Sequence, residues 1–228
     1  MTKAIEIIDL YFKYKTQGEF LLKGIDLSVE KGDVLTIVGL SGNGKSTLCY
    51  AMCGIIPHIY KGQLTGEVRI DGKSISCMKI PEIATKVGIV FQDPDTQLFS
   101  PTVEDEIGFG PENLCVPRAE IGQRIERVLK QIDMEAYRYE NPNNLSGGQK
   151  QLIALGAVLS LEPHILIFDE AMAQIDAQGK QQIKRVIRDL KNRGKTIIMI
   201  EHDFNNLDVA DRVMLLRDGK LEKFEGEL

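Results

Sequence analysis

The sequence predicts an α/β fold with an antiparallel β subdomain and a helical subdomain, and three observations lead to this class. Four short apolar runs of the kind that forms buried strands are separated by stretches with helical periodicity. The opening residues combine short strands with frequent turns, which is typical of an antiparallel β layer. A glycine-rich turn joins the first core strand directly to a helix.

The first part of the chain is expected to form the antiparallel layer. Apolar and polar residues partly alternate from Ala4 to Leu10, and 21–29 has the same character. A turn at 31–33 then leads into the wholly apolar strand 34–38. A helix is expected over 47–54, after the glycine-rich turn.

The remaining elements follow from the same periodicities and from turn residues such as Asp71-Gly72 and Asp218-Gly219. Thr102 begins a helix because it resembles the first residue of a capping box that ends at Asp105. We expect further strands at 62–70, 87–91, 165–168, 196–200, 212–216 and 220–224, and further helices at 80–86, 119–132, 150–161 and 178–192.

The glycine-rich turn has the pattern of a phosphate-binding loop, which is a strand, a turn and then Gly-Lys-Ser at a helix start. Glycines let backbone N–H groups point toward one centre, where the helix dipole adds partial positive charge. A lysine is disfavoured at a helix start unless an anion binds there, and no acidic residue lies between Asp33 and Glu67. The sequence therefore predicts a nucleoside triphosphate site formed by Gly39, Ser41, Gly42, Asn43, Gly44, Lys45, Ser46 and Thr47.

A second anion-binding helix start is predicted at Leu145–Gln149, directly before the helical run 150–161. Ser146 can cap this helix, while Gly147 and Gly148 expose its first N–H groups.

Polar residues also stand where three core strands end. Gln92, the pair Asp169 and Glu170, and His202 each follow a buried apolar strand. Ligand contacts in α/β sheets lie at these carboxyl ends. In a phosphate-loop fold the first carboxylate faces Mg²⁺ and the second can reach the attacking water. His202 could contact a γ-phosphate, or it could be an ordinary loop histidine.

Two other features have a structural alternative to a functional role. Tyr14 could stack on a purine base, or it could pack on the core as an edge-strand aromatic. The acidic run 104–106 is interpreted as a dipole-favoured helix start rather than a metal site.

Composition excludes some classes of function for these 228 residues. The net charge of −5 argues against a nucleic-acid-binding surface. The apolar stretches are shorter than the roughly 20 residues that a membrane-spanning helix needs, so a membrane role requires a partner. We interpret 1–228 as a single domain, in which a helical subdomain at about 92–160 interrupts a nucleotide-binding core at about 1–91 and 161–228.

The order of the phosphate loop, Gln92, the Leu-Ser-Gly-Gly-Gln pentapeptide at 145–149, the acidic pair and His202 resembles the ATP-binding cassette (ABC) ATPases. The resemblance covers nearly all of the chain and implies a P-loop NTPase core. It implies the following roles: Lys45 on the β- and γ-phosphates, Ser46, Gln92 and Asp169 on Mg²⁺, Glu170 as general base, His202 as switch histidine, Tyr14 on adenine and Asp176 as the D-loop aspartate.

The runs 91–99, 102–106 and 109–113 resemble more closely the ATPase subunits of energy-coupling-factor importers, which take up vitamins and transition-metal ions. The run 55–62 is similar to members that fuse two cassettes. This resemblance implies a peripheral ATPase at the cytoplasmic face of the cell membrane, without nucleic acid. It would pair head to tail with a copy or a sibling and would act on an integral membrane transport subunit.

The chain departs from the family pattern at three places. Leu152 replaces the usual arginine, 171–175 replaces Pro-Thr-x-Gly-Leu, and Glu201 replaces a small hydroxyl residue. Two alternatives therefore stay open, a soluble ABC ATPase of repair or translation and a regulatory cassette that binds ATP without hydrolysing it.

Overall fold

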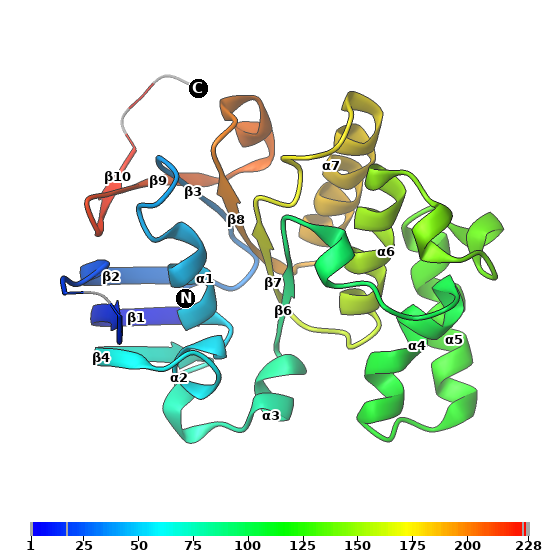
Figure 1. Cartoon of the computed structure of the whole chain (residues 1–228), viewed down its shortest axis with the longest axis horizontal. Helices are drawn as coiled ribbons and strands as arrows, with labels where there is room; N and C mark the ends of the chain where they lie inside the picture. The colour runs from blue at the N-terminus through cyan, green and yellow to red at the C-terminus, as the bar shows by residue number, and fades with distance from the viewer. Residues whose placement is uncertain (1, 17, 225, 227–228) are drawn as a thin grey trace.

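The computed structural model describes residues 2–16, 18–224 and 226. Figure 1 shows an antiparallel sheet on one side, a parallel sheet in the middle and a group of helices on the other side. The first and last strands of the chain, β1 and β10, lie on the side of the two sheets, away from those helices.

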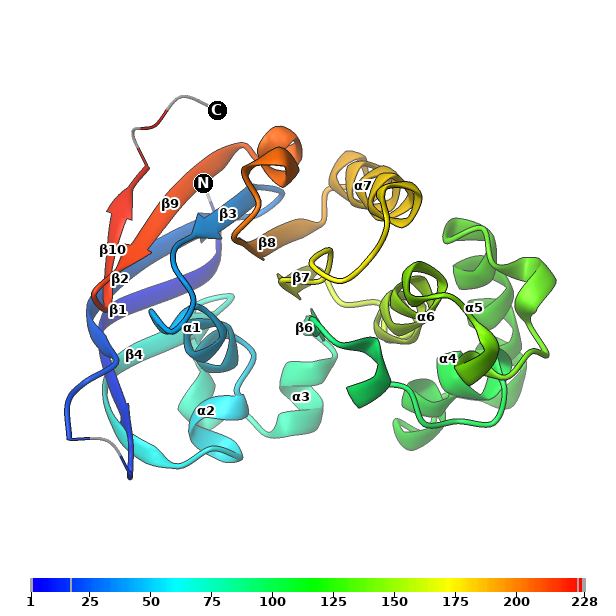
Figure 2. The same ribbon diagram turned by 45° about the horizontal axis from the view of Figure 1, so that its top comes forward.

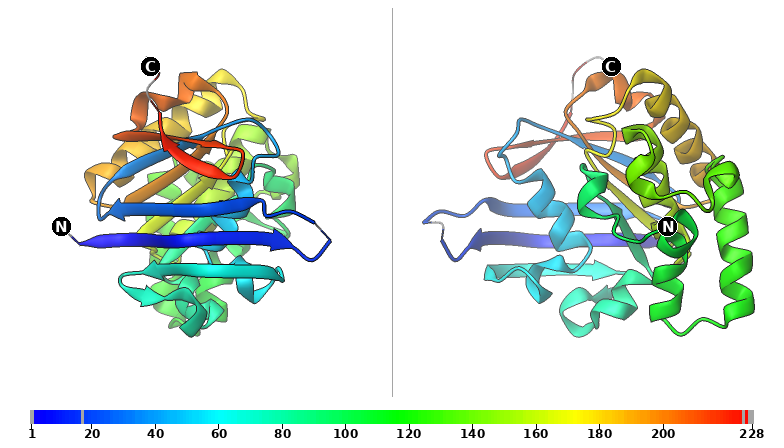
Figure 3. Two further views of the ribbon diagram at one scale, coloured as in Figure 1. Left: turned by 90° about the vertical axis from the view of Figure 1, so that its left-hand side faces the viewer. Right: turned by 45° about the vertical axis from the view of Figure 1, so that its right-hand side comes forward.

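The antiparallel sheet has four strands in the order β2-β1-β4-β5. Figure 3 shows it covering the side of the molecule opposite the helical group. Its first strand extends past the predicted end at Leu10, because pairing continues to Phe12–Leu22 on the β2 side and to Tyr14–Gly62 on the β4 side. The bounds are β1 Lys3–Tyr14, β2 Leu22–Glu30, β4 Gly62–Ile70 and β5 Lys73–Ser74.

The second sheet has six strands in the order β10-β9-β3-β8-β7-β6, parallel except for β10. Strands β3, β7 and β8 are buried over their whole length, as apolar runs in a parallel sheet require. All six predicted core strands form, with bounds β3 Val34–Val38, β6 Val87–Val90, β7 Ile165–Asp169, β8 Thr196–Glu201, β9 Arg212–Arg217 and β10 Lys220–Lys223.

The helices fall on the two faces of the parallel sheet (Figure 2). Helix α1 lies between the two sheets and buries Leu48 and Met52 in the core that they share. Helices α6 and α7 cover the opposite face, and α4 and α5 pack outside α6. The bounds are α1 Lys45–Met52, α2 Ile55–His58, α3 Ile80–Ala84, α4 Val103–Asn113, α5 Arg118–Gln131, α6 Gly147–Leu159 and α7 Ala177–Asn192.

Three local details bear on the predictions. Thr102 caps α4 as expected, since its Oγ1 accepts a 3.2 Å hydrogen bond from the Asp105 N–H. Several short segments were not anticipated, among them the kinked α2 and the 3₁₀ helix η5 at Phe204–Val209. The division at about 92–160 stays an interpretation, because one apolar core joins α4, α5 and α6 to β7 and α7.

Across residues 2–16, 18–224 and 226, no helix has the length and apolar character to cross a membrane.

Candidate functional site

The register of the parallel sheet brings the predicted strand-end residues together. Val38 pairs with Glu201 and Asp169 pairs with Ile200, so β3, β7 and β8 end side by side. The residues that follow these ends are Gly39, Glu170 and His202. The site is therefore assembled at the carboxyl edge of the sheet, as the sequence predicted.

The phosphate loop leaves the first helix without a side-chain cap. Gly44 is the N-cap residue of α1, with φ of 94° in the left-handed region that favours glycine, and no side chain bonds the helix N–H groups. Gly39 is required by packing, because a Cβ there would lie 2.3 Å from the carbonyl oxygen of Leu216. The loop thus keeps the first turn of α1 available to an external anion.

Lys45 lies at the centre of this loop and is 4% exposed. Its Nζ donates to the carbonyl oxygens of Gly39 at 2.9 Å and Leu40 at 3.2 Å, and it lies 3.2 Å from Glu170 Oε1. A buried ammonium group is costly without such partners. These contacts hold the Lys45 cation inside the loop, close to where phosphate oxygens would lie.

Asp169 and Ser46, two of the three residues predicted with Gln92 to hold Mg²⁺, are bonded to each other. Ser46 Oγ donates a 3.0 Å hydrogen bond to Asp169 Oδ1. Burial raises the pKa of Asp169 to about 6, with a further contribution from neighbouring Glu170, while the bond from Ser46 acts in the opposite direction. A buried carboxylate beside a hydroxyl is a suitable oxygen pair for Mg²⁺, which would also relieve the cost of the charge.

A metal ion at this site would not be coordinated by a cluster of acidic or imidazole side chains. In the described part of the chain no three His, Cys, Asp or Glu residues are grouped to hold a metal ion. Mg²⁺ commonly takes one or two carboxylates and completes its shell with water and substrate phosphates, so the Ser46–Asp169 pair fits it.

Glu170 is held between two cationic or potentially cationic groups. Its Oε1 lies 3.2 Å from Lys45 Nζ, and its Oε2 lies 3.2 Å from His202 Nδ1. Its φ of 51° is unusual for a residue other than glycine, and such backbone conformations often occur at functional sites. Only 14% of the Glu170 side chain is exposed, against 48% of His202. This geometry aims a carboxylate at the loop from the end of β7.

Lys45, Ser46 and Glu170 line a cavity of about 330 Å³, whereas Asp169 and His202 are not among its lining residues. Gln92 reaches it from the end of β6 and Leu21 from the start of β2, while most of the lining comes from the phosphate loop. The lining residues are Leu21, Ser41, Gly42, Gly44, Lys45, Ser46, Thr47, Gln92 and Glu170. Its walls carry the groups expected for a polyphosphate.

Tyr14 lies beside this cavity rather than in its lining. Its hydroxyl lies 3.1 Å from Thr47 Oγ1, and its ring packs edge to face on Phe12 with centroids 4.9 Å apart. The packing agrees with the interpretation as an aromatic on the core, but β1 is an interior strand of its sheet and not an edge strand. The contact with Thr47 places the tyrosine next to the loop. Adenine stacking stays a prediction.

The pentapeptide Leu145–Gln149 leads into α6, and it contains a complete capping box. Ser146 Oγ accepts from the Gln149 N–H at 3.3 Å, and Gln149 Oε1 accepts from the Ser146 N–H at 2.9 Å. Gly148 is buried, and a Cβ there would lie 3.2 Å from the Gly179 Cα of α7. The sequence therefore predicted the cap correctly, but it gave no sign of this close contact between the two helices.

Asp176 lies at the same contact and caps α7, because its Oδ1 accepts a 2.8 Å hydrogen bond from the Gly179 N–H. Asp176, predicted to be the D-loop aspartate, and the start of α6 are thus neighbours within one chain. Neither Asp176 nor Ser146, Gly147, Gly148 and Gln149 lines the cavity of the phosphate loop.

Sequence reasoning missed two buried polar residues near the site. Glu201, at the end of β8, is 1% exposed. Burial raises its pKa to about 7, although a 3.0 Å hydrogen bond from Asn206 acts in the opposite direction. Gln151 on α6 donates a 2.8 Å hydrogen bond to the carbonyl oxygen of Phe91, directly before Gln92. The departure of Glu201 from the family pattern could have indicated this buried carboxyl group. Gln151 lies among apolar helix residues, and nothing in the sequence marked it.

Comparison with known proteins agrees with this geometry. Residues 22–173 match the family described as ABC transporter. An energy-coupling factor transporter ATP-binding protein of Methanocaldococcus jannaschii is 40% identical over 222 residues, covering 96% of this chain and 77% of the relative. An ABC transporter ATP-binding protein of Methanosarcina mazei is 42% identical over 95% of this chain, which spans only 38% of that relative's length.

Two solved structures share the fold. The cbiO1 protein of Clostridium perfringens, described as part of the ABC transporter complex cbiONQ, superposes with a TM-score of 0.87 at 33% identity, covering 97% of this chain and 87% of that one. The ATP-binding cassette MJ0796, a dimer in a post-hydrolysis state bound to ADP and phosphate, gives 0.80 at 27% identity, covering 98% and 100%.

Proposed function

Because the chain belongs to the ATP-binding family of ABC transporters, we propose that it is the ATP-hydrolysing module of an energy-coupling-factor importer. ATP-driven closure of two modules would power uptake of a vitamin or a transition-metal ion by membrane partners. The observation that carries the proposal is Glu170 held between Lys45 and His202, beside the Ser46–Asp169 pair.

On binding ATP, the first turn of α1 and Lys45 take the phosphate oxygens. Lys45 then exchanges its contact with Glu170 for the β- and γ-phosphates, which frees one carboxylate oxygen. Mg²⁺, held by Ser46 and Asp169 with Gln92 nearby, would neutralise charge on the phosphates. Catalysis consists mainly of positioning and charge stabilisation.

Glu170 is the residue suited to orient the attacking water and accept its proton. Its side chain extends from the end of β7 toward the phosphate loop, and its Oε2 lies 3.2 Å from His202 Nδ1. His202 is exposed enough to reach a γ-phosphate as well. A positioned base of this kind typically contributes about 10²–10⁴-fold to the rate.

A second module would complete the site. In one chain the start of α6 lies apart from the phosphate loop, on the helical side of the parallel sheet (Figures 1 and 2). Ser146, Gly147 and Gly148 would therefore meet the nucleotide of a partner module arranged head to tail. The dimeric ADP-bound relative supports the pairing of two modules.

The membrane subunit would dock around Gln92 and the helical subdomain, which places the module at the cytoplasmic face of the membrane. The cbiO1 relative, described as part of a transporter complex, supports transport over repair or translation. The intact contacts of Glu170 with Lys45 and His202 oppose a non-hydrolysing regulatory cassette.

The test is Glu170→Gln, measured as phosphate release and as ATP-dependent association in sedimentation. We expect turnover to fall by about 10²–10³-fold while an ATP-bound dimer accumulates. Exchanging Glu222, an exposed carboxylate paired with Arg217, for Gln is the matched control. Unchanged turnover in Glu170→Gln would remove Glu170 from the mechanism.

A further inference from the structure

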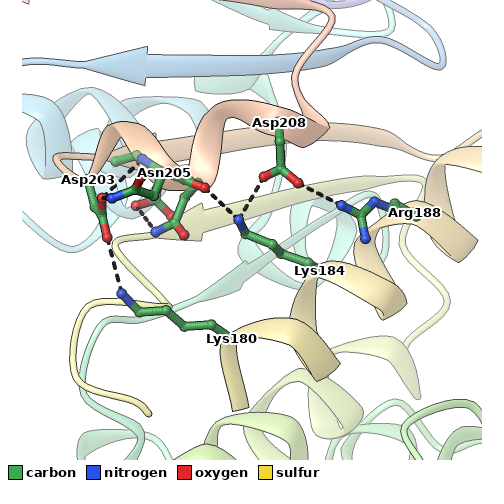
Figure 4. Close-up of polar contacts among 8 residues, drawn as sticks. Lys180, Lys184, Arg188, Asp203, Asn205 and Asp208 are labelled. Atoms are coloured by element: carbon green, nitrogen blue, oxygen red, sulfur yellow. Dashed lines mark hydrogen bonds and ion pairs between the residues drawn. The ribbon is translucent and has the colours of Figure 1, made fainter. Parts of the chain in front are cut away.

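The segment that follows His202 is held to helix α7 by a group of charged and polar side chains, shown in Figure 4. This segment is the 3₁₀ helix η5, Phe204–Val209, with Asp203 as its N-cap residue. Three cationic side chains project from successive turns of α7 toward it, namely Lys180, Lys184 and Arg188.

Lys184 makes the central contacts of this group. Its Nζ donates to the backbone carbonyl oxygen of Asn205 at 2.6 Å and to Asp208 Oδ1 at 2.7 Å. Arg188 bonds the other oxygen of Asp208 at 2.6 Å, and Lys180 bonds Asp203 at 3.2 Å. The segment after His202 is therefore held at three positions, which are Asp203, Asn205 and Asp208.

The environment of Lys184 separates it from its two neighbours. Only 7% of its side chain is exposed, against 27% for Lys180 and 50% for Arg188. It lies on the buried face of α7 with Ile183 and Ile187. An apolar residue is the ordinary choice at such a position, and a buried ammonium group is costly unless it is fully paired.

The strand side of the His202 loop is anchored as well. Asn206 is 1% exposed, and its side-chain amide donates a 3.0 Å hydrogen bond to Glu201, the residue before His202. The loop is thus fixed on both sides of a histidine whose own ring is half exposed and faces Glu170. The orientation of the imidazole depends on these anchors more than on packing of the ring.

We propose that Lys184 is a positioning residue, which holds the 203–208 segment so that His202 faces Glu170. This inference rests on the proposed function. Because α7 begins at Ala177, directly after its N-cap residue Asp176 and next to the start of α6, the same helix connects the predicted dimer-facing residues to the His202 loop. Closure of two modules would thereby act on His202 through α7.

The experiment compares Lys184→Met with Lys191→Met in ATP turnover at saturating and limiting ATP. Lys191 lies two turns further along α7, is more exposed than Lys184 and pairs with Asp211, so Lys191→Met makes the same exchange away from the His202 loop. We expect Lys184→Met to lower kcat by about tenfold with KM within about twofold, and Lys191→Met to change neither.

A second arm tests whether the effect passes through His202. In a His202→Ala background, Lys184→Met should cause no further fall in kcat, because residues that act as a unit are not additive. Equal losses in both backgrounds, or a loss shared by Lys191→Met, would overturn the proposal. Inactive wild-type protein would instead refute the proposed function, not the positioning role alone.

A third variant guards against misfolding of Lys184→Met. Asp208→Asn keeps the bond from Lys184 to the Asn205 carbonyl oxygen and removes one charge, so it should lower kcat in the same direction by a smaller factor. Hydrogen exchange of the amides at 203–209 should rise in both variants. Unchanged kcat and exchange in Asp208→Asn would also overturn the proposal.

Discussion

The two glycine-rich helix starts of this chain, at α1 and at α6, are built in opposite ways. The start of α1 has no side-chain cap, contains the buried Lys45 and lies against Asp169 and Glu170. The start of α6 has no acidic residue in its first turn and is closed by its own capping box. The start of α1 thus has charged neighbours and no side-chain cap, whereas the start of α6 is capped by side chains of the chain itself.

This difference indicates which start binds nucleotide first. At α1 Lys45 pairs with Glu170, while Asp169 is bonded by Ser46, and burial raises the pKa of Asp169 to about 6. Phosphates and a metal ion would replace these internal contacts by better ones. At α6 no such imbalance exists, so its contribution should appear only when a partner brings a nucleotide to it.

The largest effect should come from removing the charge at α1. Lys45→Met should weaken ATP binding to the single chain by about a hundredfold or more, because charge-assisted bonds to phosphate contribute about 1.5–3 kcal/mol each. Titration with a fluorescent ATP analogue measures this loss.

The matched control for Lys45→Met lies on the other helix. Lys150→Met removes a cation just after the start of α6, where it pairs with Asp95, and should leave the affinity of the single chain unchanged. Equal losses in the two variants would remove the proposed difference between the helix starts.

The second effect concerns how stability depends on pH through the buried carboxyl group of Glu201 at the end of β8. The pKa of Glu201 is about 7 in the folded chain against 4.5 without burial, so the folded state keeps a proton that the unfolded state releases. The stability contribution of Glu201 is therefore lost as pH rises from about 4.5 to about 7, by at most about 3 kcal/mol.

Glu201→Gln should remove that loss. Denaturant unfolding at pH 8 should show the variant more stable than the wild type by about 1–3 kcal/mol, with a much smaller difference at pH 4.5. Glu82, an exposed carboxylate paired with Lys73, provides the control exchange to Gln. A variant less stable than the wild type at pH 8 would show that Glu201 is paired more strongly than its environment indicates.

A smaller effect should follow from opening the capping box of α6. Ser146→Ala should lower the free energy of unfolding by about 1 kcal/mol and weaken ATP-dependent association, with ATP affinity of the single chain unchanged. Thr102→Ala removes the equivalent cap of α4 and should reproduce only the loss of stability. Association that is equally weak in both variants would point to a general loss of structure instead.

The smallest effect should come from the contact between α6 and α7. Gly148→Ala places a Cβ 3.2 Å from the Gly179 Cα, so the helices must separate by a few tenths of an ångström and stability should fall by about 1 kcal/mol. Gly122→Ala, on α5 where a Cβ meets no atom within 4 Å, should instead be slightly stabilising. Thermal unfolding of the two variants compares them directly.

The chain's local patterns were sufficient to predict the core strands, the phosphate loop and the strand-end positions of Gln92, Asp169, Glu170 and His202. Apolar runs and glycine-rich turns restrict the backbone wherever they occur, so these features do not depend on distant residues. Ser146 as a cap belongs to the same class, because its partner Gln149 is three residues away.

Contacts between distant segments had to be supplied by the tertiary structure. The burial of Glu201, the pairing of Lys184 with Asp208, and the approach of Gly148 to Gly179 each join residues whose spacing in sequence has no periodic meaning. Their energies come from desolvation and close packing, which exist only once the sheet and its helices are assembled. Sequence alone predicted where the phosphates should bind, while the fold decided what surrounds and orients the groups predicted to act on them.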